Sequence, residues 1–154
     1  MPIVSAGLLT YRLRKDIVEV FLVHPGGPFW TRKDAGAWSI PKGLIDADEE
    51  PLAAARREFK EETGFKVSGD FTELSSVKLK SGKVLLAWAV EGDCDPSRIR
   101  SNTFLMEWPP HSGRQQEFPE VDRAAWFQIN EARKKINQGQ LPLLEELVRM
   151  LTSK

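Results

Sequence analysis

Apolar, β-branched runs separated by polar turns occur along the chain and predict strands in pairs. Residues 3–11 and 17–23 are such runs on either side of a polar stretch, so they predict a β-hairpin. Residues 71–80 and 83–91 predict a second pair, because the Ser-Gly dipeptide between them suits a tight turn. Short strands are also expected over residues 103–107 and 125–129.

Two other segments carry helical signals. Residues 51–63 are predicted to form a helix, since Pro51 suits its first turn and Gly64 suits its C-terminal cap. Residues 142–151 hold four leucines at helical spacing and predict a second helix, and Asn130 suits the N-cap of a helix before it. Long loops are expected over residues 24–38, 92–100 and 108–119.

Strands followed by helices, without a repeat or a linker, predict one domain over residues 1–154. Its expected class is an α/β or α+β sandwich with a mixed sheet. The chain has 154 residues, which is enough to bury a core of its own.

Composition excludes several partners and compartments. Lys and Arg total 22, as do Asp and Glu, so there is no basic excess to favour nucleic acid or an anionic membrane. No apolar run approaches the roughly 20 residues that span a bilayer. Cys94 is the single cysteine, so no internal disulfide can form, and a reducing, cytoplasmic location is expected. The oligomeric state stays open.

The most informative segment is residues 43–65, which holds seven acidic and three basic side chains in an otherwise neutral protein. On a helix, Glu58, Glu61 and Glu62 lie three and four positions apart and share one face. Such carboxylates repel one another, and Mg²⁺ binds carboxylate oxygens together with water and substrate phosphates. The plain alternative is a solvated acidic face in which Arg57 simply pairs with Glu61.

The spacing of the whole segment resembles the Nudix box of the Nudix hydrolase superfamily. Gly43 is followed after five residues by Glu49, after seven more by Arg57-Glu58-Phe59, then by Glu61-Glu62 and Gly64-Phe65. The resemblance implies a Nudix-fold α/β/α sandwich in which a loop–helix–loop binds Mg²⁺ or Mn²⁺ against a pyrophosphate.

The same resemblance implies roles for the residues of the box. Glu58 and Glu62 would be direct metal ligands, and Glu61 a ligand or the holder of a metal-bound water. Arg57 would orient the glutamates together with Glu49. Gly43 would shape the loop and offer its carbonyl to the metal.

The residues before the box, Trp38-Ser39-Ile40-Pro41-Lys42-Gly43, resemble the W-x-x-P-K-G lead-in of the diadenosine and diphosphoinositol polyphosphate branches. Lys42 is either a phosphate contact or a solvated loop lysine. Trp38 is either a platform for a base or part of the packing of the sheet. Further lysines, at positions 78, 80 and 83, lie on the following strand pair.

Family members often supply another carboxylate from a loop before a late strand that begins near a tryptophan. Glu120, six residues before Trp126, is the first candidate here, and Glu117 is the second. Either would be a metal ligand or the general base that activates water, with a solvated loop acid as the alternative. Arg114, and also Arg32 and Lys33, are candidates for phosphate contact. The two histidines, His24 and His111, are assigned no role.

The expected function is a metal-dependent phosphohydrolase that cleaves the pyrophosphate of a nucleoside diphosphate linked to another group, with a small nucleotide as its substrate. A dinucleoside polyphosphate is the favoured substrate. The tyrosine that diadenosine polyphosphate hydrolases carry about 17 residues beyond the box is absent, however, and so is the proline of the ADP-ribose branch. The alternatives are a nucleoside triphosphate pyrophosphatase, a diphosphoinositol polyphosphate hydrolase, or a non-catalytic ligand sensor.

Overall fold

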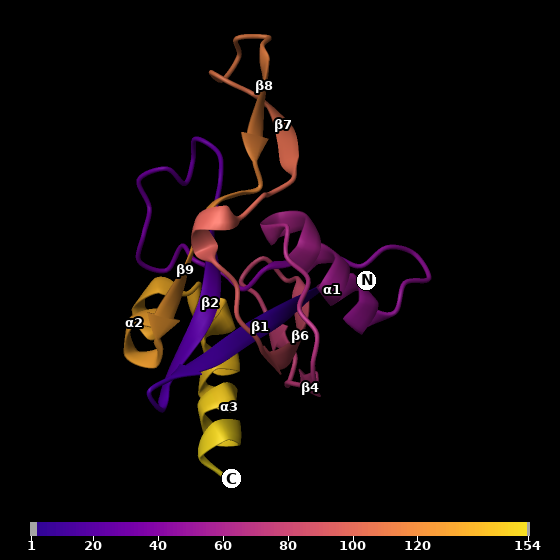
Figure 1. The fold of residues 1–154 in the computed structure, drawn as a ribbon. Coiled ribbons are helices and arrows are strands. Elements are labelled where there is room, and N and C mark those ends of the chain that lie inside the picture. Colours follow the sequence, from indigo (N-terminus) through magenta and orange to yellow (C-terminus); the bar gives the residue numbers. More distant parts are fainter. Residues whose placement is uncertain (1–2, 154) are drawn as a thin grey trace.

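A mixed seven-stranded sheet forms the centre of the protein in the computed structural model, which describes residues 3–153 (Figure 1). The strand order is β4-β6-β1-β2-β9, with β3 paired to β1 and β5 paired to β6. Only the β1–β6 pair is parallel, and the other pairs in this sheet are antiparallel. The strands are β1 (Val4–Arg14), β2 (Ile17–Pro25), β3 (Lys42–Leu44), β4 (Thr72–Glu73), β5 (Val77–Lys78), β6 (Val84–Glu91) and β9 (Val121–Gln128).

Helices cover both faces of this sheet, as Figure 1 shows, and the alternation of side chains along β1 explains why. Leu8 packs with Ala55 and Phe59 of α1 (Pro51–Thr63) on one face. Leu9 packs on the other face with buried residues of α2 (Ile129–Lys135) and α3 (Leu141–Thr152). Successive residues of a strand point to opposite faces, so one strand contributes to two cores. The predicted α/β/α sandwich with a mixed sheet is confirmed.

A second, two-stranded sheet stands apart from this sandwich. It is an antiparallel hairpin of β7 (Thr103–Glu107) and β8 (Gln115–Pro119), and it projects from the body of the molecule above α1 (Figure 1). Two short 3-10 turns, η1 (Pro96–Arg98) and η2 (Gln138–Gln140), complete the elements.

The predicted elements need four corrections. Residues 108–119 are not wholly irregular, because β8 occupies their last part. The closing strand begins at Val121 rather than at residue 125, because it pairs with β2 along its length. The strand expected over 71–80 is reduced to β4 and β5, two residues each. Helix α2 begins at Ile129, so its N-cap is Gln128 and not Asn130.

Candidate active site

Helix α1 presents the acidic residues of the box because its other face is anchored in the core. Phe59 and Ala55 are fully buried against the sheet, which leaves Glu58, Glu61 and Glu62 on the half-buried side. The helix ends at Gly64, whose φ of 82° is left-handed and whose N–H donates to the Lys60 carbonyl at 2.7 Å. The local signals of this segment thus place three glutamates on the half-buried side of α1 that faces away from the sheet.

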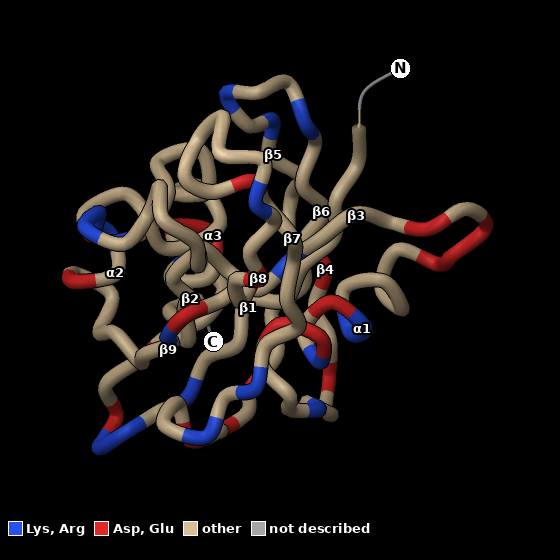
Figure 2. The backbone as a smooth tube through the Cα atoms, turned by 90° about the horizontal axis from the view of Figure 1, so that it is seen from above, with Lys and Arg blue, Asp and Glu red and all other residues tan. Residues whose placement is uncertain are grey.

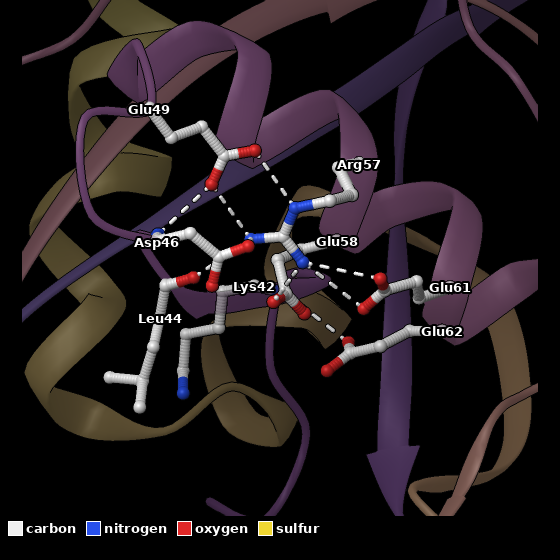
Figure 3. A network of polar contacts seen from close by, with 8 residues as sticks. All are labelled: Lys42, Leu44, Asp46, Glu49, Arg57, Glu58, Glu61 and Glu62. Carbon is white, nitrogen blue, oxygen red and sulfur yellow. Dashed lines mark hydrogen bonds and ion pairs between the residues drawn. The ribbon is translucent and has the colours of Figure 1, made fainter.

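Arg57 holds the box together through its whole guanidinium (Figure 3). Its Nε and one terminal nitrogen donate to Glu49 at 2.8 and 2.9 Å, and the latter also donates to the Leu44 carbonyl at 3.0 Å. The other terminal nitrogen donates to Glu58 at 2.9 Å and to both oxygens of Glu61 at 3.2 Å. These bonds raise the pKa of Arg57 and, with the Asp46 N–H, lower the pKa of Glu49 to about 2. Arg57 therefore ties the loop before α1 to the glutamates of the helix.

Gly43 makes room for the Glu58 carboxylate. A Cβ at position 43 would lie 2.1 Å from the carboxyl carbon of Glu58, so the Glu58 carboxylate would have to move away. Glu58 is only 14% exposed, and this burial raises its pKa, although the bond from Arg57 opposes the effect. The glycine of the box is thus required by the close approach of a carboxylate to the main chain of β3.

Glu62 and Lys42 are two half-buried charged residues of the site, and the hydrogen bond between them comes from the main chain of Lys42. The Lys42 N–H donates to Glu62 Oε1 at 3.2 Å. Burial raises the pKa of Glu62 to about 8, with the nearby charges of Glu58 and Glu120 adding to the effect. Burial also lowers the pKa of Lys42, and the charge of Lys83 contributes in the same direction. A desolvated carboxylate among other carboxylates favours the arrival of a cation.

Glu120 joins this cluster from the far end of the chain. It lies between β8 and β9, and its charge raises the pKa of Glu62 and opposes the lowering of the pKa of Lys42. Its N–H donates to the Asn102 carbonyl at 2.9 Å, and the Asn102 N–H donates to the Glu61 carbonyl at 2.8 Å. Two main-chain bonds therefore connect Glu120 to the C-terminal end of α1.

The other candidate residues lie elsewhere. Glu117 is exposed on β8, where it pairs across the hairpin with Leu105. Arg114 is exposed at the turn of the same hairpin. The Trp38 indole is 4% exposed and packs on Phe127 in the core, so it offers no open face to a base. Of the two interpretations of Trp38, a platform for a base or part of the packing of the sheet, its position agrees with the second.

The acidic groups of the box fit a cation that is completed by substrate and water. Figure 2 shows acidic residues along the loop between β3 and α1 and on α1 itself. Within residues 3–153, no three acidic, histidine or cysteine side chains are gathered so as to enclose a metal on their own. Mg²⁺ takes one or two carboxylates and fills its remaining positions with water and phosphate oxygens. The donor set of Glu58 and Glu62 matches that pattern.

Of the lysines at positions 78, 80 and 83 that the sequence offers, Lys83, in the turn before β6, acts on the pKa of Lys42. One feature of the site has no signal in the sequence. Asn102 contributes only main-chain atoms, so no side-chain pattern marks it.

Across the described part of the chain, no helix is long and apolar enough to cross a membrane.

Comparison with known proteins bears on the whole chain. A family profile described as the NUDIX domain matches residues 1–147. Nudix hydrolase 7 of Arabidopsis thaliana is 28% identical over 116 residues, which are 70% of this chain and 39% of that protein. The chain spans half or less of the length of the curated relatives it matches.

Solved structures of similar fold cover nearly all of the chain. A C. elegans Ap4A hydrolase binary complex has a TM-score of 0.68 at 22% identity and covers 99% of each chain. The NUDIX domain of Shewanella oneidensis NrtR, complexed with ADP ribose, has a TM-score of 0.66 at 17% identity. That match covers 98% of this chain and 89% of the other. At these identities the likeness shows the fold alone.

Proposed function

This chain belongs to the NUDIX domain family, whose profile covers residues 1–147, and from that premise we propose that it is a metal-dependent phosphohydrolase. Its reaction is attack of water on a phosphorus of a nucleoside diphosphate linked to another group. One phosphorus–oxygen bond of the anhydride breaks, and the two phosphate-bearing products separate. The observation that carries this proposal is the cluster of the half-buried Glu58 and Glu62 with the exposed Glu120, beside Lys42.

The metal follows from the chemistry of that cluster. Glu58 and Glu62 would hold Mg²⁺ or Mn²⁺, with the Gly43 carbonyl beside Glu58 and with Glu61 as a further ligand or the holder of a bound water. When bound, the ion supplies charge neutralisation to the phosphate oxygens and lowers the pKa of water. The raised pKa of Glu62 supports this role, because a cation relieves the electrostatic cost of a desolvated carboxylate.

Three side chains would accept the proton of water, contact the phosphate and orient the metal ligands. Glu120 accepts the proton of the attacking water as it bonds to phosphorus, as a positioned carboxylate does in general base catalysis. Lys42 contacts a phosphate oxygen as a point charge. Arg57 touches Glu49, Glu58 and Glu61, so it orients ligands and does not contact substrate.

The substrate class is proposed from the basic edge of the site. Lys83 acts on the pKa of Lys42, so two lysines lie beside the acidic cluster and offer contacts for phosphates beyond the scissile pair. A dinucleoside polyphosphate uses such contacts more than a sugar-linked diphosphate does. Nucleoside triphosphates and diphosphoinositol polyphosphates share the same chemistry, and the ligand-sensor alternative predicts binding without turnover.

The test is phosphate release from a nucleotide panel with Mg²⁺, using the wild type, Glu58→Gln and Glu62→Gln. Each substitution should lower turnover by about 100-fold or more, because charge stabilisation in the transition state is lost. The melting temperature of the metal-free protein should not fall, since burial disfavours the charged form of both carboxylates. Glu50→Gln, an exposed acid of the same segment, is the control and should keep full activity. Full activity in either box variant, or no hydrolysis by the wild type, would refute the proposal.

A further inference from the structure

His24 is a buried histidine that the proposed chemistry does not use. Its ring is fully buried at the end of β2 and packs edge-on against Trp38, with ring centroids 5.3 Å apart. Its Nε2 lies 2.6 Å from the Lys33 carbonyl, and its Nδ1 lies 2.8 Å from Oδ1 of Asp122. The carbonyl can only accept, so Nε2 carries a hydrogen and donates it. A hydrogen bond between Nδ1 and the Asp122 carboxylate then requires a second proton, carried either by the ring or by the carboxyl group.

This pair spans an irregularity between β2 and β9. His24 is paired with Arg123, whereas the next residue, Pro25, is paired with Val121. Asp122 is therefore the extra residue of a β-bulge, and its carboxylate turns toward His24. Bulges bend a strand and redirect side chains, and they are frequent beside active sites.

Next to the bulge, the chain after β2 is in close contact with the segment that contains Glu120. The Gly26 N–H donates to the Glu120 carbonyl at 2.9 Å. A Cβ on Gly26 would lie 2.0 Å from the Pro119 carbonyl oxygen, so only glycine allows the two main chains to approach this closely. On the other side, the Glu120 N–H donates to Asn102, which is bonded to the end of α1. Both main-chain polar groups of Glu120 are therefore hydrogen-bonded. The bond between Gly26 and Glu120 lies next to the His24–Asp122 pair, because Gly26 is two residues after His24 and Glu120 is two residues before Asp122.

We propose that His24 and Asp122 are positioning residues, whose hydrogen bond locks the bulge and keeps Glu120 directed at the acidic end of α1. The bond from His24 to the Lys33 carbonyl also fixes the long loop after β2, because His24 is bonded both to that loop and to Asp122 of β9. This inference rests on the proposed role of Glu120 as the proton acceptor. It adds two residues that touch neither substrate nor metal.

Asp122 is the residue to change, since its side chain is 32% exposed whereas His24 is wholly buried and its loss threatens folding. Asp122→Ala should lower kcat on the order of 10- to 100-fold with little change in KM, because a small displacement of a catalytic group has that cost. Asp122→Asn keeps an oxygen and an N–H at the same reach and should restore most of the activity. Asp93→Ala, which removes an ion pair with Arg12 at the other end of the sheet, is the matched control and should be silent.

A double-mutant cycle separates positioning from general damage. In a Glu120→Gln background, Asp122→Ala should cause no further loss of kcat, because the group that it positions is already disabled. Amide hydrogen exchange gives a readout independent of activity: the Gly26 N–H should exchange faster in Asp122→Ala, while that of Val84, bonded to Ile3, should not change.

The outcomes distinguish the inference from the function beneath it. Equal losses from Asp122→Ala in both backgrounds, or unchanged exchange at Gly26, would overturn the lock and leave the role of Glu120 standing. If Glu120→Gln keeps the wild-type kcat, Glu120 is not the proton acceptor, and the His24–Asp122 pair has no catalytic group to position. The hydrolase assignment would remain. A wild type that hydrolyses no nucleotide would overturn both proposals.

Discussion

Single residues of the site depend on one another, and Gly43 with Glu58 is the clearest case. The Glu58 carboxylate occupies the space that any Cβ at position 43 would need. A glycine at the head of the box therefore follows from packing against a carboxylate. The backbone at this position needs no left-handed conformation, because Gly43 is not among the positive-φ glycines.

Gly43→Ala should abolish most activity while costing only modest stability, because Glu58 must swing away from its place beside Arg57. We expect a loss of kcat of about 100-fold, the scale for a displaced or missing charge-stabilising group. Gly36→Ala is the control: its Cβ would meet nothing within 4 Å, although its φ of 72° is strained for alanine. The control should lose melting temperature and keep kcat, and an active Gly43→Ala protein would contradict the argument.

The two downstream acids should differ sharply. Both are exposed, but the charge of Glu120 acts on the pKa values of Glu62 and Lys42, whereas Glu117 lies on the projecting hairpin. Glu120→Gln is therefore expected to lower kcat by roughly 10²–10⁴-fold, and Glu117→Gln should have almost no effect. Steady-state kinetics at saturating Mg²⁺ measures both. Equal, small losses would place the proton acceptor elsewhere, with Glu61 or Glu49 as the next candidates.

Between elements, Arg57 is the connection that fixes the loop before α1 to the helix. The bonds to Glu49 and Leu44 come from the loop, and those to Glu58 and Glu61 come from the helix itself. Lysine cannot replace this pattern, because an ammonium is a point charge without the planar fork of arginine.

This connection predicts an acid dependence of stability. The folded pKa of Glu49 is about 2, chiefly because Arg57 bonds to it, whereas an unfolded glutamate titrates near its ordinary value of 4.5. The unfolded state therefore binds the proton first, so the contribution of Glu49 is present above pH 4.5 and is lost as pH falls toward 2. Melting temperatures from pH 2.5 to 5.5 should rise less steeply in Glu49→Gln than in the wild type. Glu50→Gln should keep the wild-type slope, and equal slopes in all three proteins would contradict the assignment.

Elements differ in how far their sequences predict them. Helix α1 is predictable because Pro51, Gly64 and the buried Phe59 are all local signals within one segment. Strand β8 is not, since its polar residues are exposed on both faces and show no alternation; its partner β7 supplies the order. That Glu58, Glu61 and Glu62 share one face of α1 follows from their spacing, whereas their roles are implied only by the family resemblance. The position of Glu120 depends instead on the pairing of β2 with β9, which no local pattern specifies.

For the whole molecule, the site draws on three distant segments: β3, α1 and the junction of β8 with β9. The turn between β5 and β6 adds Lys83 at its edge. The protein has no net charge, so the proposed attraction for a polyanionic substrate would have to come from this local arrangement.

That arrangement predicts the ranking of substrates. Diadenosine tetraphosphate should be hydrolysed faster than ADP-ribose at matched Mg²⁺, because its longer bridge reaches Lys42 and Lys83. Lys42→Ala should harm the former more, chiefly in KM and most at low ionic strength. Lys60→Ala, an exposed lysine of α1, is the control and should leave the ratio of kcat/KM values unchanged. A preference for ADP-ribose would refute the ranking and leave the hydrolase proposal intact.

The pairing of β2 with β9 also has a consequence for how the protein folds. It joins Val20 to Phe127 and Val23 to Ala124, residues about a hundred positions apart. Contacts at such separations form slowly, because the chain entropy of closing a long loop is lost before any contact compensates for it. The box helix can form early from its own local signals, but Glu120 reaches it only once the last strand has docked. If Glu120 is the proton acceptor, a refolding chain should therefore become active only after β9 has docked and the sheet is complete.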